Sequence, residues 1–349
     1  MRIIINDIAA EKGGALTVLE SFYNYIRNND TENEYIFILS GNYIEETDRI
    51  KVLIKDDVKK SGLHKMWFDF VSGSRYIESL KPDYVLSLQN IITFGVRCRQ
   101  GVYVHQSIPF QKVKRFSLLK GSERGTAIIQ RFIGSIIKKS VRRADDVFVQ
   151  TDWMRENVAE LSRVDINKVT TVPFEIELPD DNEIVTKCPT NSFFYPATAE
   201  SIYKNHNVIY EAIDILNAEG IYDFKVKLTL PKDIPSKREN IEHCGMLDKA
   251  KLYDEYRNNI LLFPSYIETI GLPLMEARSV KSVIFAADCQ YSREVLSDYS
   301  NAHFFETFNA KMLAELMKEA LQGQITLTPD NYTYDNRIGW KVLIDRIVE

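Results

Sequence analysis

The stretch 260–288, ILLFPSYIETIGLPLMEARSVKSVIFAAD, has the pattern that decides the fold. Its apolar run 260–263 has the length and composition of a buried strand, and Pro264 ends that run. Pro273 then falls where the first turn of a helix tolerates proline, because the missing N–H has no intrahelical partner there. A second apolar run, 283–287, follows the helix. The stretch therefore predicts a strand, a loop, a helix and a second strand.

Two glutamates lie in this stretch, Glu268 in the loop and Glu276 in the first turn of the expected helix. A helix N-terminus presents free N–H groups and a partial positive charge, which suit a phosphate or a polarised sugar oxygen. The carboxylates would accept hydrogen bonds from hydroxyls beside that site. Acidic residues also gather at helix starts for dipole reasons alone, so the spacing leaves both interpretations open.

Length and composition limit the classes of protein. A chain of 349 residues indicates two domains, and 45% hydrophobic with 27% charged residues excludes a disordered protein. The net charge of −5 gives no global drive toward nucleic acid or anionic lipid. Four cysteines without paired spacing fit a reduced compartment and neither a disulfide framework nor a zinc site. With no leader and no membrane-spanning run, we expect a cytoplasmic protein.

Apolar runs alternate with helical patterns along the whole chain, which predicts an α/β fold with two doubly wound parallel sheets. In such sheets ligands bind at the carboxyl ends of the strands. We expect an N-terminal Rossmann-like domain over 1–178, a second one over 179–335 that starts with a linker at 179–182, and a terminal helix over 336–349 that returns to the first domain. One of the helices in the first domain is expected over 67–80.

Two features of the first domain fall at such carboxyl ends. Gly13 and Gly14 separate the first strand from its helix, where glycine lets the backbone approach a phosphate, although a plain tight turn has the same pattern. His105 ends the run VYVH ahead of a loop. A lone histidine is often structural, and only its place at a strand end favours a role in binding.

The segment 111–143 has a different character, because it contains ten basic residues against Glu123 alone, a net charge of +9. Apolar residues recur at helical spacing between the bases, from Ile128 to Ile137. A basic amphipathic helix can lie on an anionic membrane surface, which would make the protein peripheral on the inner face of a membrane. The alternative is a core helix with a solvated basic face, and both can hold at once.

The sequence lacks the motifs of several common catalytic sites. The sequence has no Asp-x-Asp triplet, no histidine pair with metal spacing, no Gly-x-x-x-x-Gly-Lys loop and no Gly-x-Ser-x-Gly elbow. A cleft between two sheet domains, lined by amides, a cation and carboxylates, suits a nucleotide diphosphate joined to a sugar. The candidates for that cleft are Gly13, Gly14, His105, Lys204, Glu268, Gly271 and Glu276.

The sequence resembles the retaining glycosyltransferases of family 4, which have the two-domain GT-B fold. The resemblance rests on landmarks that occur in the family's order over nearly the whole chain: KGGAL (12–16), VYVHQSIP (102–109), VQTDWM (149–154), VPF (172–174), YKNH (203–206), GMLDKAKLYDEY (245–256), FPSYIETIGLPLMEA (263–277), REVL (293–296) and Trp340. The most specific is the block in which seven residues separate Glu268 from Glu276.

The resemblance implies a role for each matching residue. Glu268 would bind hydroxyls of the donor sugar, Glu276 the ribose hydroxyls, and Lys204 the departing diphosphate. His105 would touch the reacting sugar. The remaining matches would contact the donor through backbone amides, around its phosphates or at its base: Gly13, Gly14, Met246, Leu247, Thr269, Ile270, Gly271 and Leu272.

The implied reaction is the transfer of a sugar from a nucleotide-diphosphate sugar to a glycan or lipid-linked glycan, with retention of configuration and without metal or cofactor. One departure stands out, because the family has an arginine shortly before the lysine and none occurs between Tyr195 and Lys204. Losing a bidentate arginine is not conservative. The alternatives are a GT-B nucleotide-sugar epimerase or hydrolase, and a relative that binds nucleotide sugar without catalysis.

Overall fold

The computed structural model describes residues 1–11, 13–174, 176, 183–197, 199–236, 238–330 and 339–349. These residues form two compact units, Met1–Glu175 with Asn336–Glu349, and Ile176–Asp335. Each unit is described by itself below. The expected domain boundaries, at 178/179 and 335/336, and the expected linker at 179–182 lie outside the described residues.

The described part of the N-terminal unit contains a seven-stranded sheet in the order β3-β2-β1-β4-β5-β6-β7, with parallel pairing throughout. All residues of β4 and β6 are buried, as expected for strands covered on both faces. The strands are β1 (Arg2–Asn6), β2 (Glu34–Leu39), β3 (Ile50–Ile54), β4 (Tyr84–Ser87), β5 (Arg99–Val104), β6 (Asp146–Val149) and β7 (Val169–Thr171).

Helices cover this sheet, and their buried residues follow helical spacing. Helix α1 (Gly14–Asn29) buries a stripe that includes Leu19, Phe22 and Ile26. The other helical segments are η1 (Asp56–Lys60), α2 (Gly62–Trp67), the π-helical turn η2 (Phe68–Ser72), α3 (Gly73–Ser79), α4 (Gly121–Ile128), the π-helical turn η3 (Ile129–Ile133), α5 (Gly134–Arg143), α6 (Asp152–Ser162) and η4 (Ile166–Lys168).

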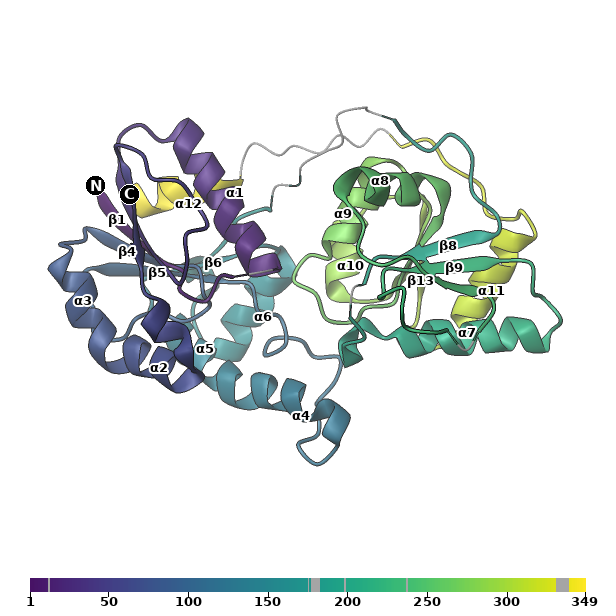
Figure 1. The fold of residues 1–349 in the computed structure, drawn as a ribbon, viewed down its shortest axis with the longest axis horizontal. Helices are drawn as coiled ribbons and strands as arrows, with labels where there is room; N and C mark the ends of the chain where they lie inside the picture. Colours follow the sequence, from purple (N-terminus) through teal and green to yellow (C-terminus); the bar gives the residue numbers. More distant parts are fainter. Residues whose placement is uncertain (12, 175, 177–182, 198, 237, 331–338) are drawn as a thin grey trace. The chain divides into compact units, whose positions relative to one another are not determined.

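The terminal helix α12 (Gly339–Val348) packs on the N-terminal unit beside α1 (Figure 1). The Trp340 indole N–H donates to Ser21 Oγ at 2.8 Å, and the ring lies 5.2 Å from that of Phe22. Near the other end of the helix, Arg346 pairs with the buried Asp146 at 3.2 Å. The expected return of the terminal helix to the first sheet is confirmed.

The C-terminal unit contains a second parallel sheet, whose described strands follow the order β10-β9-β8-β11-β12-β13. All residues of β11 and β12 are buried, which confirms the two apolar runs of the stretch 260–288 as core strands. The strands are β8 (Ser192–Tyr195), β9 (Lys225–Leu228), β10 (Ile241–His243), β11 (Ile260–Phe263), β12 (Ile284–Ala287) and β13 (Ala302–Phe305).

Two groups of helices cover this sheet (Figure 1). Helices α7 and α11 pack on each other, while α8, α9 and α10 form the second group. The helical segments are η5 (Ile202–Lys204), α7 (His206–Ala218), α8 (Lys249–Asn258), α9 (Leu272–Ser279), α10 (Gln290–Val295) and α11 (Ala310–Leu321). The predicted α/β architecture with two doubly wound parallel sheets is confirmed.

The helix expected over 67–80 begins earlier than predicted, at Gly62. The Ser61 hydroxyl accepts the backbone N–H of His64, so this serine caps the helix six residues before the expected start. The π-helical turn η2 then lies inside the helical run. Its wide turn shifts the faces of the helix and weakens the apolar periodicity that the prediction used.

Candidate functional site

The candidate site lies at the carboxyl edge of the second sheet, where the loops after the neighbouring strands β8 and β11 meet. The backbone N–H of Tyr266 donates to the Tyr203 carbonyl at 3.0 Å, and the Ser265 hydroxyl donates to the same carbonyl at 3.2 Å. These bonds join residues more than 60 positions apart in the sequence. They hold the loop that carries Lys204 against the loop that carries Glu268.

Lys204 and Glu268 form an ion pair in this corner. The distance from Lys204 Nζ to Glu268 Oε1 is 2.6 Å, and the Ser265 hydroxyl donates to the same oxygen, also at 2.6 Å. The side chains are 27% and 18% exposed, so the pair is largely shielded while still open to solvent on one side. The structure thus brings together two residues that the sequence suggested separately.

Asn205 fixes the backbone beside the lysine. Its φ of 55° lies in the left-handed region, which asparagine tolerates better than most residues. Its side-chain amide donates to the Thr307 carbonyl at 2.7 Å and to the Pro264 carbonyl at 3.3 Å. Because these carbonyls belong to the loops after β13 and β11, one side chain connects three loops. A further bond runs from the Tyr195 hydroxyl to the Lys204 carbonyl at 2.9 Å.

Gly271 starts helix α9 in a left-handed conformation, with φ 80°. A Cβ at this position would lie 3.2 Å from the rings of Phe263 and Tyr291, so both conformation and space favour glycine. Thr269, Ile270 and Leu272 complete the turn. In the first turn of α9, Pro273 has no N–H, and the Leu274 N–H donates to the Gly271 carbonyl at 2.8 Å. The backbone amides up to Leu272 are therefore the candidates for the anion site that the sequence indicated at the end of β11.

Glu276 is the fifth residue of α9 and lies in the second turn, so its expected place in the first turn was wrong. The helix itself starts at Leu272, as expected from the sequence, with Pro273 in its first turn. The Tyr256 hydroxyl donates to Glu276 Oε2 at 2.6 Å. Burial raises the pKa of Glu276, against the lowering effects of that bond and of Lys249. Hydroxyl donors from a ligand would restore the solvation that this carboxylate lacks.

Met246 and Leu247 follow β10, which two strands separate from β11 in the sheet. Met246 is 86% exposed and Leu247 is partly buried. An exposed methionine is a flexible apolar surface of the kind that can pack on a flat ring. The two residues share the carboxyl edge with Lys204 and Glu268, as parallel pairing requires.

In the N-terminal unit, Gly13 and Gly14 lie at the carboxyl end of β1, where Gly13 (φ 63°, ψ −152°) precedes helix α1. A Cβ on either glycine would meet nothing within 4 Å, so open space surrounds both. His105 follows β5 on the same edge, and its backbone N–H donates to Asn90 Oδ1 at 2.7 Å. Burial lowers the pKa of His105 to about 4, which makes the ring neutral at neutral pH.

Three residues of the site were missed in the sequence: Asn205, Tyr256 and Ser265. All three lie inside quoted landmarks, but their side chains contact residues that are distant in the chain. Within the described ranges, no group of three or more histidine, cysteine, aspartate or glutamate side chains is arranged to hold a metal ion.

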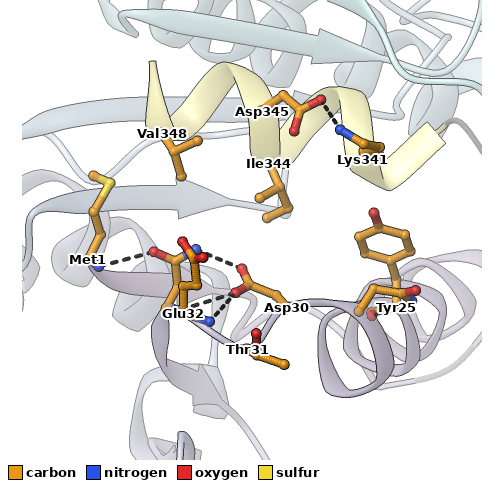
Figure 2. Close-up of a pocket in the computed structure, with 11 residues that line it drawn as sticks. Met1, Tyr25, Asp30, Thr31, Glu32, Lys341, Ile344, Asp345 and Val348 are labelled. Atoms are coloured by element: carbon orange, nitrogen blue, oxygen red, sulfur yellow. Dashed lines mark hydrogen bonds and ion pairs between the residues drawn. The ribbon is translucent and has the colours of Figure 1, made fainter.

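A separate cleft of about 540 Å³ lies in the N-terminal unit (Figure 2). Residues that precede β1 and β2 line it together with α12, so it occupies the amino edge of the sheet, opposite the edge where parallel sheets bind ligands. Asp30 and Met1 are already bonded to Asn33 there. The lining residues are Met1, Tyr25, Asn29, Asp30, Thr31, Glu32, Asn33, Lys341, Ile344, Asp345 and Val348.

Comparisons with known proteins agree with this geometry. Residues 199–337 match the family model Glycosyl transferases group 1. The O-antigen chain mannosyltransferase RfbU of Salmonella typhimurium is 20% identical over 249 residues, which are 66% of this chain and 69% of that protein.

Solved structures share the fold. The lipopolysaccharide outer core galactosyltransferase WaaB matches with a TM-score of 0.64 and 14% identity, covering 99% of this chain and 95% of WaaB. Anabaena HepE, solved with UDP and glucose, matches with a TM-score of 0.62 and 12% identity, covering 100% of this chain and 96% of HepE. The family match and the fold together support a glycosyltransferase of the GT-B type.

Proposed function

We propose that the protein is a retaining, metal-independent glycosyltransferase that moves a sugar from a nucleotide-diphosphate sugar to a glycan or lipid-linked glycan. The observation that carries this proposal is the Lys204–Glu268 pair beside the start of α9, with Glu276 four residues into that helix. A cation, free amides and two carboxylates at one sheet edge match the parts of a nucleotide sugar. The one departure from the family pattern is the absent arginine before Lys204. The lysine, the amides and the two carboxylates are all present.

Each group has a distinct task in the proposed reaction. Lys204 and the amides of Ile270 to Leu272 stabilise the diphosphate, where negative charge develops as the glycosidic bond breaks. Glu268 binds hydroxyls of the donor sugar and Glu276 binds those of the ribose. Met246 and Leu247 pack against the base. The departing phosphate takes the proton of the acceptor hydroxyl, so that no protein base is required on that side.

The neutral state of His105 suits a hydrogen-bonding role on the sugar. With a pKa of about 4 the imidazole holds one N–H donor and one acceptor at neutral pH and carries no charge. A cation near the reacting carbon would oppose the positive charge that builds up there. Gly13 and Gly14, with open space around them, offer backbone amides to phosphate or acceptor.

The relatives support a bacterial surface glycan as the acceptor class. RfbU is named as an O-antigen chain mannosyltransferase and WaaB as a lipopolysaccharide galactosyltransferase. The bound UDP of HepE supports a nucleotide-sugar donor. Acceptors of this kind are attached to lipid, which connects the proposal to the basic segment 111–143.

We propose that this segment contacts an anionic membrane surface. Helical structure begins at Gly121, and the preceding turn exposes Leu119 (92%) beside Lys120. On the helical part Phe132 is 60% exposed. Exposed apolar side chains between bases are typical of an interfacial segment. In the described parts of the chain, no helix is both long and apolar enough to cross a bilayer.

The structure also shows which bases to test. Lys138 and Lys139 lie over aromatic rings, at 5.7 Å from Phe110 and 5.3 Å from Phe94, so they support packing. Neutralising Lys120 and Arg124 and replacing Leu119 with serine should lower binding to phosphatidylglycerol vesicles about tenfold at low salt. Unchanged sedimentation of this variant with the vesicles would refute the membrane contact.

The proposed reaction is tested by incubating the purified chain with common nucleotide sugars, with and without a bacterial lipid extract, in EDTA. We expect release of the nucleoside diphosphate that the extract stimulates, and an α-linked product from an α-linked donor by NMR. Donor consumption without stimulation would indicate the epimerase or hydrolase. Binding without consumption would indicate the non-catalytic relative, and loss of activity in EDTA would contradict metal independence.

A further inference from the structure

Lys204 and Glu268 each have a ligand in the proposed function, yet in this structure they bind each other. The 2.6 Å pair uses the lysine that is proposed to bind diphosphate and the carboxylate that is proposed to bind the sugar. A ligand that takes either partner must compete with the other. The pair therefore makes the affinity of one part of the donor depend on the other part.

The surroundings hold this pair in place. Ser265, which is fully buried, donates to the same Glu268 oxygen, and Asn205 fixes the backbone next to Lys204. Exposed ion pairs contribute little because solvent screens them and two long side chains must be ordered. Here the side chains are only 27% and 18% exposed and the loops are already joined, so both costs are reduced.

We infer that Glu268 is a specificity-determining residue that makes the site favour a nucleotide sugar over the bare nucleoside diphosphate. A bare diphosphate withdraws Lys204 and leaves the Glu268 carboxylate without its cation in a shielded corner. A sugar-bearing donor supplies hydroxyls to Glu268 at the moment its phosphates take Lys204. The inference rests on the proposed function, because it assumes that both parts of the donor bind here.

The same competition for Lys204 affects the release of the product. After transfer, the nucleoside diphosphate remains without its sugar, and Glu268 is again free to pair with Lys204. The ion pair then competes directly with the phosphates for the lysine. The site thereby weakens its hold on the product without weakening its hold on the intact donor.

The test is the affinity of the full chain for UDP, GDP and inorganic pyrophosphate, with UDP-glucose and GDP-mannose as sugar-bearing partners. Glu268→Gln keeps the shape of the side chain and removes its charge. We expect this variant to bind the bare diphosphates about three- to tenfold more tightly in calorimetry, because Lys204 no longer has a competing anion. The preference for the sugar-bearing form should fall by at least the same factor.

Two controls isolate the pair. Glu255→Gln breaks the Lys227–Glu255 pair of the same unit, which has a length of 2.9 Å and exposures of 26% and 21%, and it should change no affinity. The double variant Lys204→Met/Glu268→Gln should show no gain over Lys204→Met alone, because the effect requires the lysine. Thermal unfolding checks that each variant folds, and Glu268→Asp, which withdraws the carboxylate by one methylene, replaces any Glu268→Gln protein that does not.

Unchanged or weaker binding of bare diphosphates by folded Glu268→Gln would overturn the inference, and so would an equal gain in the Glu255→Gln control. Failure of the proposed function has a different signature. In that case the native chain would neither bind nor consume the nucleotide sugars, whereas failure of the inference alone leaves native donor turnover intact.

Discussion

The carboxyl edges of the two sheets share a topology and differ in chemistry. The second edge carries the Lys204–Glu268 pair and a partly buried carboxylate, Glu276, whose pKa is raised. The first edge offers Gly13, Gly14 and a histidine that is neutral at neutral pH. The difference teaches that one fold can pair a lysine with a carboxylate at the candidate site of one unit and keep the candidate histidine of the other unit neutral.

The largest effect is expected from Lys204→Met, because it removes the cation from the charged edge. We expect transfer to fall about 100- to 1,000-fold, the usual loss when a group that stabilises developing charge is removed. The measurement is kcat/KM for donor turnover. Lys227→Met is the matched control, since it removes a lysine from the other shielded pair of this unit, and a comparable loss in that variant would mean that the effect comes from stability.

A second, smaller loss is expected from Glu276→Gln, about tenfold in donor affinity at pH 7.5. Because burial raises the pKa of Glu276, the native carboxylate takes up its proton at a higher pH than an ordinary glutamate. Native donor KM should therefore rise as the pH falls toward the raised pKa of Glu276, and approach that of the variant. A native KM that stays constant down to pH 4.5, the ordinary pKa of a glutamate, would remove Glu276 from the ribose site.

The raised pKa of Glu276 also affects stability, and its effect on stability has the opposite pH dependence to its effect on donor binding. A carboxyl whose folded pKa exceeds its unfolded value stabilises the fold fully below the unfolded pKa, and that contribution is lost as the pH rises through the folded pKa. Glu276→Gln should therefore leave Tm at pH 8 unchanged or raise it. A Tm that drops by several degrees would show that Glu276 holds the fold together.

On the carboxyl edge of the first sheet, His105→Asn should lower kcat by about tenfold, because a hydrogen bond is lost and no charge changes. Since the pKa of His105 is about 4, its ring does not titrate between pH 5.5 and 8. The ratio of native to variant rates should stay constant across that range. A native inflection near pH 6.5 that disappears in His105→Asn would show that the His105 ring is not neutral over this range.

The smallest effect concerns Asn205, which connects the three loops of the charged edge. Asn205→Ala should lower the free energy of unfolding by about 1–2 kcal/mol, because it loses two hydrogen bonds and keeps a Cβ in a left-handed conformation. Asn205→Gly should cost less, since glycine adopts that conformation freely. Urea unfolding measures both, and equal values would mean that the backbone conformation contributes nothing.

Most of the fold could be predicted from the sequence, because the buried strands of a parallel sheet are nearly continuous apolar segments. The runs 260–263 and 283–287 are nearly continuous apolar segments, and the structure places them as neighbouring buried strands, β11 and β12. The start of the helix at Gly62 could not be predicted so well. Its cap, Ser61, precedes the apolar pattern, and the π-helical turn breaks the period on which the prediction depends.

For the site, residue types were predictable and contacts were not. Glu268, Glu276 and Lys204 stood out because few other chemistries fitted the chain. Their mutual arrangement depends on bonds between loops about 60 and 100 residues apart, such as those of Ser265 and Asn205. The pattern of a single sequence holds no information on such pairs, so the ion pair emerged only with the structure.

The central claim, that Glu268 binds the donor sugar for transfer, is tested most directly by donor turnover in Glu268→Ala. We expect release of nucleoside diphosphate from the preferred nucleotide sugar to fall at least about 100-fold, while Glu255→Ala, from the matched pair, stays near the native rate. Turnover in folded Glu268→Ala at the native rate would show that Glu268 does not bind the donor sugar for transfer.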